Sequence, residues 1–149
     1  MLPFGSADLR LVEMSRIPTC GTLDPSGLYE GYKGIWTEGI SDCVVVVIAE
    51  PDDAGQRWSK FCFQHMPGGD MTNTLAVFEK LKPNPPNPAR CWAVFADKSN
   101  SLVGSALEGQ LLVAHLVKWG VSTTQIKWYT SGGDFKFGYR FGGGYLGEV

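Results

Sequence analysis

The chain has 149 residues and a formal net charge of −2, a length that predicts one domain spanning residues 1–149. Its content of 44% hydrophobic residues excludes a disordered chain, and the slight negative charge excludes the basic surface typical of nucleic-acid binding. No apolar run approaches the ~20 residues that cross a membrane. The N-terminal residues lack the pattern of a secretory signal, so we expect a reducing, cytoplasmic compartment and no membrane partner.

The first half of the chain predicts three strands and a long loop. Residues 9–15 alternate in polarity, which is typical of a half-exposed strand. Glycine and proline interrupt residues 18–34, so we expect a loop there. Residues 43–50 carry five β-branched residues in a row, which predicts a strand buried on both faces, and residues 58–65 predict its hairpin partner.

The second half predicts two helices and further strands. The expected elements are a helix from Thr72 or Asn73 to about Lys82, an extended connector at 83–88, a buried strand at 91–96, a helix at 101–119 ended by Gly120, a strand at 125–129, and a closing hairpin of 136–141 with 145–149. This order predicts a layered α/β (α+β) sandwich, with a mixed β-sheet and two main helices.

The cysteines and histidines do not form a metal site. The four cysteines are not spaced as C-x-x-C, and the chain has two histidines, so we expect neither a structural metal nor a cofactor. An even number of cysteines permits disulfides, but a reducing compartment favours free thiols.

A symmetric hairpin between the two central strands would bring Cys43 and His65 together. If Glu50 faces Trp58, the same register places Cys43 directly opposite His65, with their Cβ atoms about 4.5–5.5 Å apart. A slip of one residue would separate the two side chains onto opposite faces. A thiolate beside an imidazole is the usual arrangement of a cysteine nucleophile, although buried structural roles would also suit both residue types.

Residues 37–46 resemble the nucleophile segment of the CheD chemoreceptor glutamine deamidases, whose pattern is T-x-G-x-G-S-C followed by an apolar strand. Residues 63–67, Phe-Gln-His-Met-Pro, are similar to the histidine segment of that family. The similarity extends to the first strand at residues 11–14 and to the closing runs at 132–141 and 147–149.

This resemblance implies a CheD-like fold and assigns three catalytic residues. Cys43 would be the nucleophile, His65 the general acid/base, and Thr37 the residue that orients the histidine from a surface cleft. The implied reaction is hydrolysis of a glutamine side-chain amide in a target protein to glutamate and ammonia, with no cofactor or metal. Ser41 and Asp42 depart from the family pattern, and an acidic Asp42 turned inward would disfavour the thiolate.

Residues 40–43 also look like the L-S-G-C segment of bacterial deamidase toxins, the cytotoxic necrotizing factors and the Burkholderia lethal factor. The partner would then be a protein of a host or rival cell, with the enzyme delivered into that cell's cytoplasm. The CheD resemblance implies a chemoreceptor as the partner instead. Transglutamination or peptide cleavage by the same three residues would also fit this pattern, as would an inactive CheD-like binding module.

Overall fold

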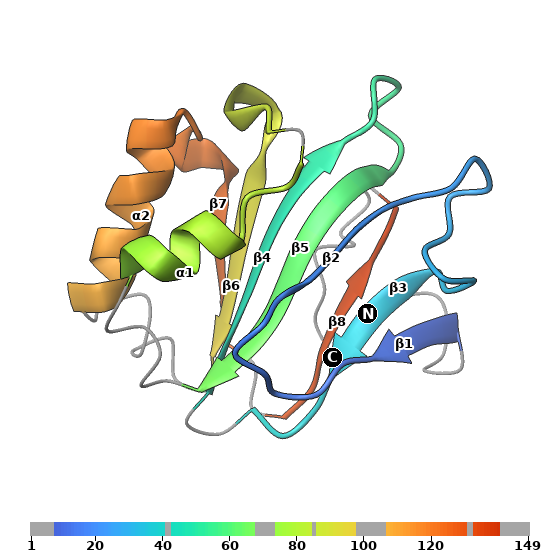
Figure 1. Cartoon of the computed structure of the whole chain (residues 1–149), viewed down its shortest axis with the longest axis horizontal. Coiled ribbons are helices and arrows are strands. Elements are labelled where there is room, and N and C mark those ends of the chain that lie inside the picture. Colours follow the sequence, from blue (N-terminus) through green and yellow to red (C-terminus); the bar gives the residue numbers. More distant parts are fainter. Residues whose placement is uncertain are drawn as a thin grey trace.

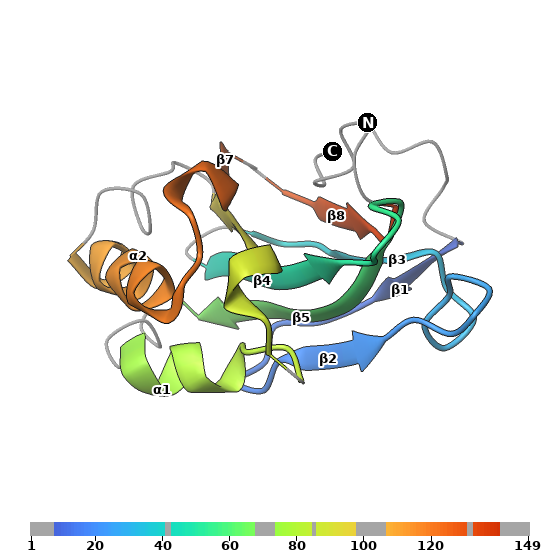
Figure 2. The same ribbon diagram turned by 90° about the horizontal axis from the view of Figure 1, so that it is seen from above.

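The computed structural model describes residues 8–40, 43–67, 74–84, 86–97, 107–130 and 133–140. A five-stranded sheet lies between two helices on one face and a three-stranded sheet on the other (Figures 1 and 2). The fold is therefore the predicted layered α+β arrangement. Its elements are β1 (Leu9–Leu11), β2 (Thr19–Thr22), β3 (Gly34–Thr37), β4 (Cys43–Pro51), β5 (Trp58–Pro67), α1 (Thr74–Lys80), β6 (Trp92–Asp97), α2 (Leu107–Trp119), β7 (Ile126–Thr130) and β8 (Phe135–Gly138).

The larger sheet has the order β2-β5-β4-β6-β7, and all its pairs are antiparallel except β6 with β7. Helix α2 connects these two parallel strands, as a crossover connection requires. The smaller sheet has the order β1-β3-β8, with β1 parallel and β8 antiparallel to β3. No helix in the described ranges is long and apolar enough to cross a membrane.

Strand β4 is the centre of the core. Val44, Val46 and Ile48 pack toward the helices, whereas Val45 and Val47 pack toward the three-stranded sheet. All five side chains are fully buried, which confirms the predicted burial on both faces. Side chains alternate along a strand, so the odd-numbered residues of β4 share the layer between the two sheets.

Helix α2 ends where its sequence predicts. Gly120 has a φ of 125°, a conformation that favours glycine, and its N–H donates to the Leu116 carbonyl at 3.1 Å. A Cβ atom at this position would lie 3.2 Å from the side chain of Pro88. The glycine therefore both stops the helix and permits a close approach of the chain that precedes β6.

Two short strands lie where the sequence predicts loop. Strand β2 falls inside the Gly- and Pro-rich residues 18–34, and β3 begins at the end of that range. Strand β1 is shorter than the predicted residues 9–15 because the chain leaves the small sheet after Leu11. The predicted helix starts at 72–73 and 101–106 and the closing hairpin strand 145–149 lie outside the described residues, as do Ser41 and Asp42.

A disulfide joins Cys20 on β2 to Cys62 on β5, so the expectation of free thiols is wrong for this pair. The two residues are direct partners in the antiparallel register, which brings their side chains together on one face. Neither their spacing nor the loop predicted around Cys20 indicates this pairing.

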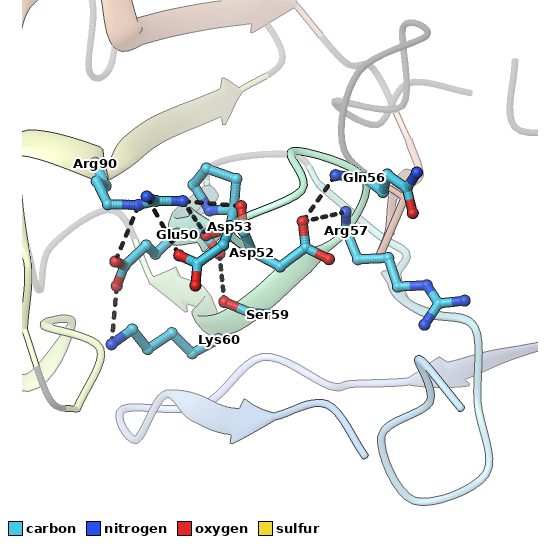
Figure 3. A network of polar contacts seen from close by, with 9 residues as sticks. Glu50, Asp52, Asp53, Gln56, Arg57, Ser59, Lys60 and Arg90 are labelled. Carbon is cyan, nitrogen blue, oxygen red and sulfur yellow. Dashed lines mark hydrogen bonds and ion pairs between the residues drawn. The ribbon is translucent and has the colours of Figure 1, made fainter. Parts of the chain in front are cut away.

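A polar network holds the turn between β4 and β5 (Figure 3). The Asp52 carboxylate accepts the Gln56 N–H at 2.8 Å, and the Asp52 N–H donates to the Arg57 carbonyl at 2.8 Å. The Arg90 guanidinium donates to the carbonyls of Pro51 and Asp52 at 3.2 and 2.8 Å. The turn is therefore longer than a minimal hairpin, and it includes an irregular pairing between Glu50 and Pro51.

Candidate active site

Thr37 and His65 form a hydrogen bond that connects the two sheets. Thr37 ends β3 and His65 lies near the end of β5, and the distance from Thr37 Oγ1 to His65 Nδ1 is 2.6 Å. Both residues are buried, with exposed fractions of 0% and 2%. The expected contact is present, but Thr37 lies in the core between the sheets and not in a surface cleft.

The segment from β3 to β4 brings Cys43 to the same end of the molecule (Figure 1). Gly39 has a φ of 74°, which allows the chain to turn after Thr37. The buried Ile40 anchors this segment, because its side chain packs against the three-stranded sheet and its N–H donates to the Gly133 carbonyl at 2.9 Å. The start of β4 is thus fixed close to the end of β3.

The predicted register that places Cys43 directly opposite His65 is wrong. Cys43 faces Pro67 and His65 faces Val45, because Glu50 pairs with Lys60 and not with Trp58. The longer turn shifts the register by two residues. An even shift keeps side chains on their original face, so Cys43 and His65 still share the layer between the sheets. Diagonal neighbours of this kind have Cα atoms about 7–8 Å apart, with Cβ atoms somewhat nearer.

The thiol and the imidazole do not form a hydrogen bond in this arrangement. The Cys43 thiol, which is partly exposed, contacts Met14 with an Sγ–Sδ distance of 3.2 Å. His65 Nε2 is buried and has no hydrogen-bond partner among the described residues. A buried ring nitrogen without a partner is uncommon in folded proteins and is typical of sites that bind or react.

Burial lowers the pKa of His65 below its ordinary value of 6.5. The imidazole is therefore neutral at pH 7 and carries one ring proton. If Nδ1 holds this proton and donates it to Thr37 Oγ1, Nε2 is left with a lone pair that can accept a proton. The site thus contains a neutral base on the same face as a partly exposed thiol.

We expect the free energy of unfolding to decrease as the pH falls below 6.5. The unfolded chain takes up a proton on His65 near pH 6.5, whereas the native chain does so at a lower pH. The unfolded state therefore binds more protons in this window and is favoured as acidity increases. Urea denaturation between pH 7.5 and 5.5 measures this slope. The His65→Gln variant should have a flatter slope, and an unchanged slope in that variant would contradict the assignment.

Cys43 should be the first cysteine to react with iodoacetamide in the absence of a reductant. Cys20 and Cys62 are joined in a disulfide, and Cys91 is fully buried. Burial, with a further contribution from the charge of Glu50, raises the pKa of the Cys91 thiol to about 11. Peptide mapping after partial alkylation at neutral pH tests this expectation. Modification of Cys91 before Cys43 would show that the thiol at the start of β4 is inert.

Sequence reasoning missed the segment that crosses this site. The Ser15 N–H donates to the His65 carbonyl at 2.9 Å, and Gln64 Nε2 donates to the Ser15 carbonyl at 2.9 Å. These contacts join residues about fifty positions apart, and no local pattern indicates them. His115 has no place in this site, because it stacks on Phe78 on the helix face of the large sheet.

No protein-family profile matches the sequence, and no curated protein matches it. Among solved structures, the chain is similar to the Bacillus licheniformis hypothetical protein YfiH, with 12% sequence identity and a TM-score of 0.39. The similarity covers 85% of this chain and 64% of that chain, so this chain spans less than two thirds of the length of its neighbour.

Proposed function

We propose that the protein is a cysteine-dependent protein-glutamine deamidase that uses Cys43, His65 and Thr37. The observation that carries the proposal is the buried His65 ring, which Thr37 holds at Nδ1 and which has no partner at Nε2 among the described residues. Cys43 is a free, partly exposed thiol on the same face. The resemblance of residues 37–46 and 63–67 to the CheD deamidases supports the same three roles.

The first half of the reaction forms a thioester. Cys43 Sγ loses its proton to His65 Nε2 and attacks the carbonyl carbon of the glutamine side chain. The backbone N–H of Cys43 lies next to the attacking atom and is the proposed donor to the oxyanion. The C–N bond then breaks, and the imidazolium gives its proton to the leaving nitrogen, which departs as ammonia.

The second half of the reaction regenerates the thiol. Water attacks the thioester while His65 Nε2 takes a proton from it, and the S–C bond breaks to release glutamate. Thr37 Oγ1 accepts the Nδ1 proton throughout, which keeps the base at Nε2. Rotation of the Cys43 side chain away from Met14 would bring Sγ nearer to the ring, since catalytic contacts are often long in the absence of substrate.

The direct test is ammonia release from proteins that carry accessible glutamines. The panel should include the cytoplasmic helical bundle of a chemoreceptor, because the CheD resemblance points to this partner, and unrelated folded proteins that represent effector targets. The matched control is the same enzyme alkylated at Cys43. We expect Cys43-dependent ammonia and conversion of glutamine to glutamate in one class of target. A Cys43-directed glutamine analogue with a haloketone in place of the amide should also alkylate this thiol, and its failure together with no ammonia would contradict the proposal.

Replacing Thr37 by valine should lower turnover by roughly 10–100-fold, as loss of a partner that orients a catalytic group does. Valine keeps the shape of threonine but removes the hydrogen bond to His65 Nδ1. Because Thr37 is fully buried, the orphaned ring nitrogen should also lower the free energy of unfolding by about 1–3 kcal/mol.

The Thr37→Ser variant is the matched control, because it keeps the hydroxyl and should retain most of the activity. Turnover and urea denaturation should be measured on both variants. Full activity in the valine variant would contradict the role assigned to Thr37.

A further inference from the structure

Residues 12–15, which we call the strap, cross the site from one sheet to the other. The Val12 N–H donates to the Trp36 carbonyl at 2.8 Å on β3, and the Ser15 N–H donates to the His65 carbonyl at 2.9 Å on β5. The side chain of Gln64 holds the Ser15 carbonyl from the β5 side. The strap is therefore fixed at both ends, beside the two strands that carry Thr37 and His65.

Met14 lies in the middle of the strap and reaches the thiol. Its Sδ atom is 3.2 Å from Cys43 Sγ, and 52% of the residue is exposed. Thr37 and His65 are buried behind the thiol, with 0% and 2% exposed. Met14 therefore occupies the side of Cys43 from which a molecule in solvent would approach.

The methionine side chain has the shape of the proposed substrate. Methionine and glutamine are both unbranched, and the third side-chain atom is Sδ in one and the amide carbon Cδ in the other. A nucleophile and the atom that it attacks are about 3–3.5 Å apart in a near-attack geometry. The distance from Met14 Sδ to Cys43 Sγ falls in this range. Sδ therefore stands where the reacting carbon of a glutamine would stand.

We propose that Met14 occupies the subsite for the substrate's glutamine side chain and must leave it before a substrate can react. This inference rests on the proposed function. Three rotatable bonds allow the thioether to swing out while the strap stays in place. A subsite of this length accepts glutamine and leaves asparagine one methylene short of the thiol. Such a difference is worth about 10–200-fold in specificity.

The first test measures access to the thiol and needs no substrate. In Met14→Ala, iodoacetamide should alkylate Cys43 on the order of tenfold faster than in the wild type, if Met14 leaves the thiol about a tenth of the time. The matched control is Ile17→Ala, which removes another exposed apolar side chain three residues away. An unchanged rate in Met14→Ala, or an equal increase in both variants, would overturn the proposal.

The second test places a glutamine in the subsite. In Met14→Gln, Cys43 Sγ should bond to the side-chain carbon of residue 14 as the C–N bond breaks and ammonia leaves. Mass spectrometry should then find residue 14 as glutamate after hydrolysis, or as a thioester to Cys43 before it. The control is Met14→Gln in the Cys43→Ser background, which should keep the amide. An intact amide in the variant with Cys43, from an enzyme that deamidates other proteins, would overturn the proposal.

The two tests separate this inference from the proposed function. Faster alkylation in Met14→Ala without ammonia from any source would support the covering of the thiol by Met14 and contradict glutamine deamidation. Cys43-dependent deamidation of a protein target, with alkylation that does not depend on Met14, would support the deamidase and contradict the subsite.

Discussion

Replacing Cys43 by serine is expected to lower ammonia release by roughly 10³-fold or more, as removal of a catalytic nucleophile does. A serine hydroxyl is a much weaker acid than a thiol. Burial lowers the pKa of His65, so this imidazole is a weak base and would not activate the hydroxyl. The thiol is only partly buried, so the free energy of unfolding should change by less than about 1 kcal/mol. Turnover and urea denaturation measure the two effects separately.

Cys91→Ala is the matched control for this variant. Cys91 is also a free cysteine, but it is fully buried on the helix face of the large sheet, whereas Cys43 shares the other face with His65. Its loss should reduce stability through a small cavity and leave turnover unchanged. Equal loss of activity in the two variants would show that the thiols act through the fold and that Cys43 is not the nucleophile.

The elements that the sequence predicts well are those with strong local signals. The apolar run that forms β4, the alternation that forms β5 and the glycine that ends α2 all depend on neighbouring residues. Strands β2 and β3 have four residues each and lie beside turn-forming glycines. Pairing with β5 and with β1 and β8 gives them their structure, and local sequence does not show those partners.

The candidate site could be predicted in its residues but not in its register. The faces of Cys43 and His65 follow from the two-residue period of a strand, and the structure keeps them together. The displacement by one pair of residues comes from the Asp52 turn and from Arg90, which is about forty positions away along the chain. A hairpin drawn from its two strands alone lacks both contacts.

The contacts that cover the site are the least predictable part. Met14 reaches Cys43 across 29 positions, and Ser15 reaches His65 across fifty. They depend on the path of the strap from the small sheet to β2, which no periodicity indicates. Cys20 meets Cys62 for the same reason, since β2 continues from the strap along the edge of β5.

The second large effect is expected at the opposite end of the hairpin, in the buried ion pair of Glu50 and Lys60. These residues face each other on β4 and β5, and Lys60 Nζ lies 2.9 Å from the Glu50 carboxylate (Figure 3). Glu50 is buried, and the Arg90 guanidinium is a second cation at 3.6 Å. The carboxylate is thus charged within the protein because two cations compensate it.

Lys60→Met should lower the free energy of unfolding by about 3 kcal/mol, the lower end of the range for a buried charge that loses its partner. The lower end is expected because Arg90 remains beside the carboxylate and the Lys60 side chain is 16% exposed. The double variant Glu50→Gln, Lys60→Met removes the charge together with its partner, and it should recover most of this loss. Urea denaturation of the single and double variants measures the difference. A cost below about 1 kcal/mol in Lys60→Met would show that the pair behaves as a surface ion pair. The rate of Cys43 alkylation below the unfolding transition should not change, because the pair lies at the turn end of the strands and the thiol at the other.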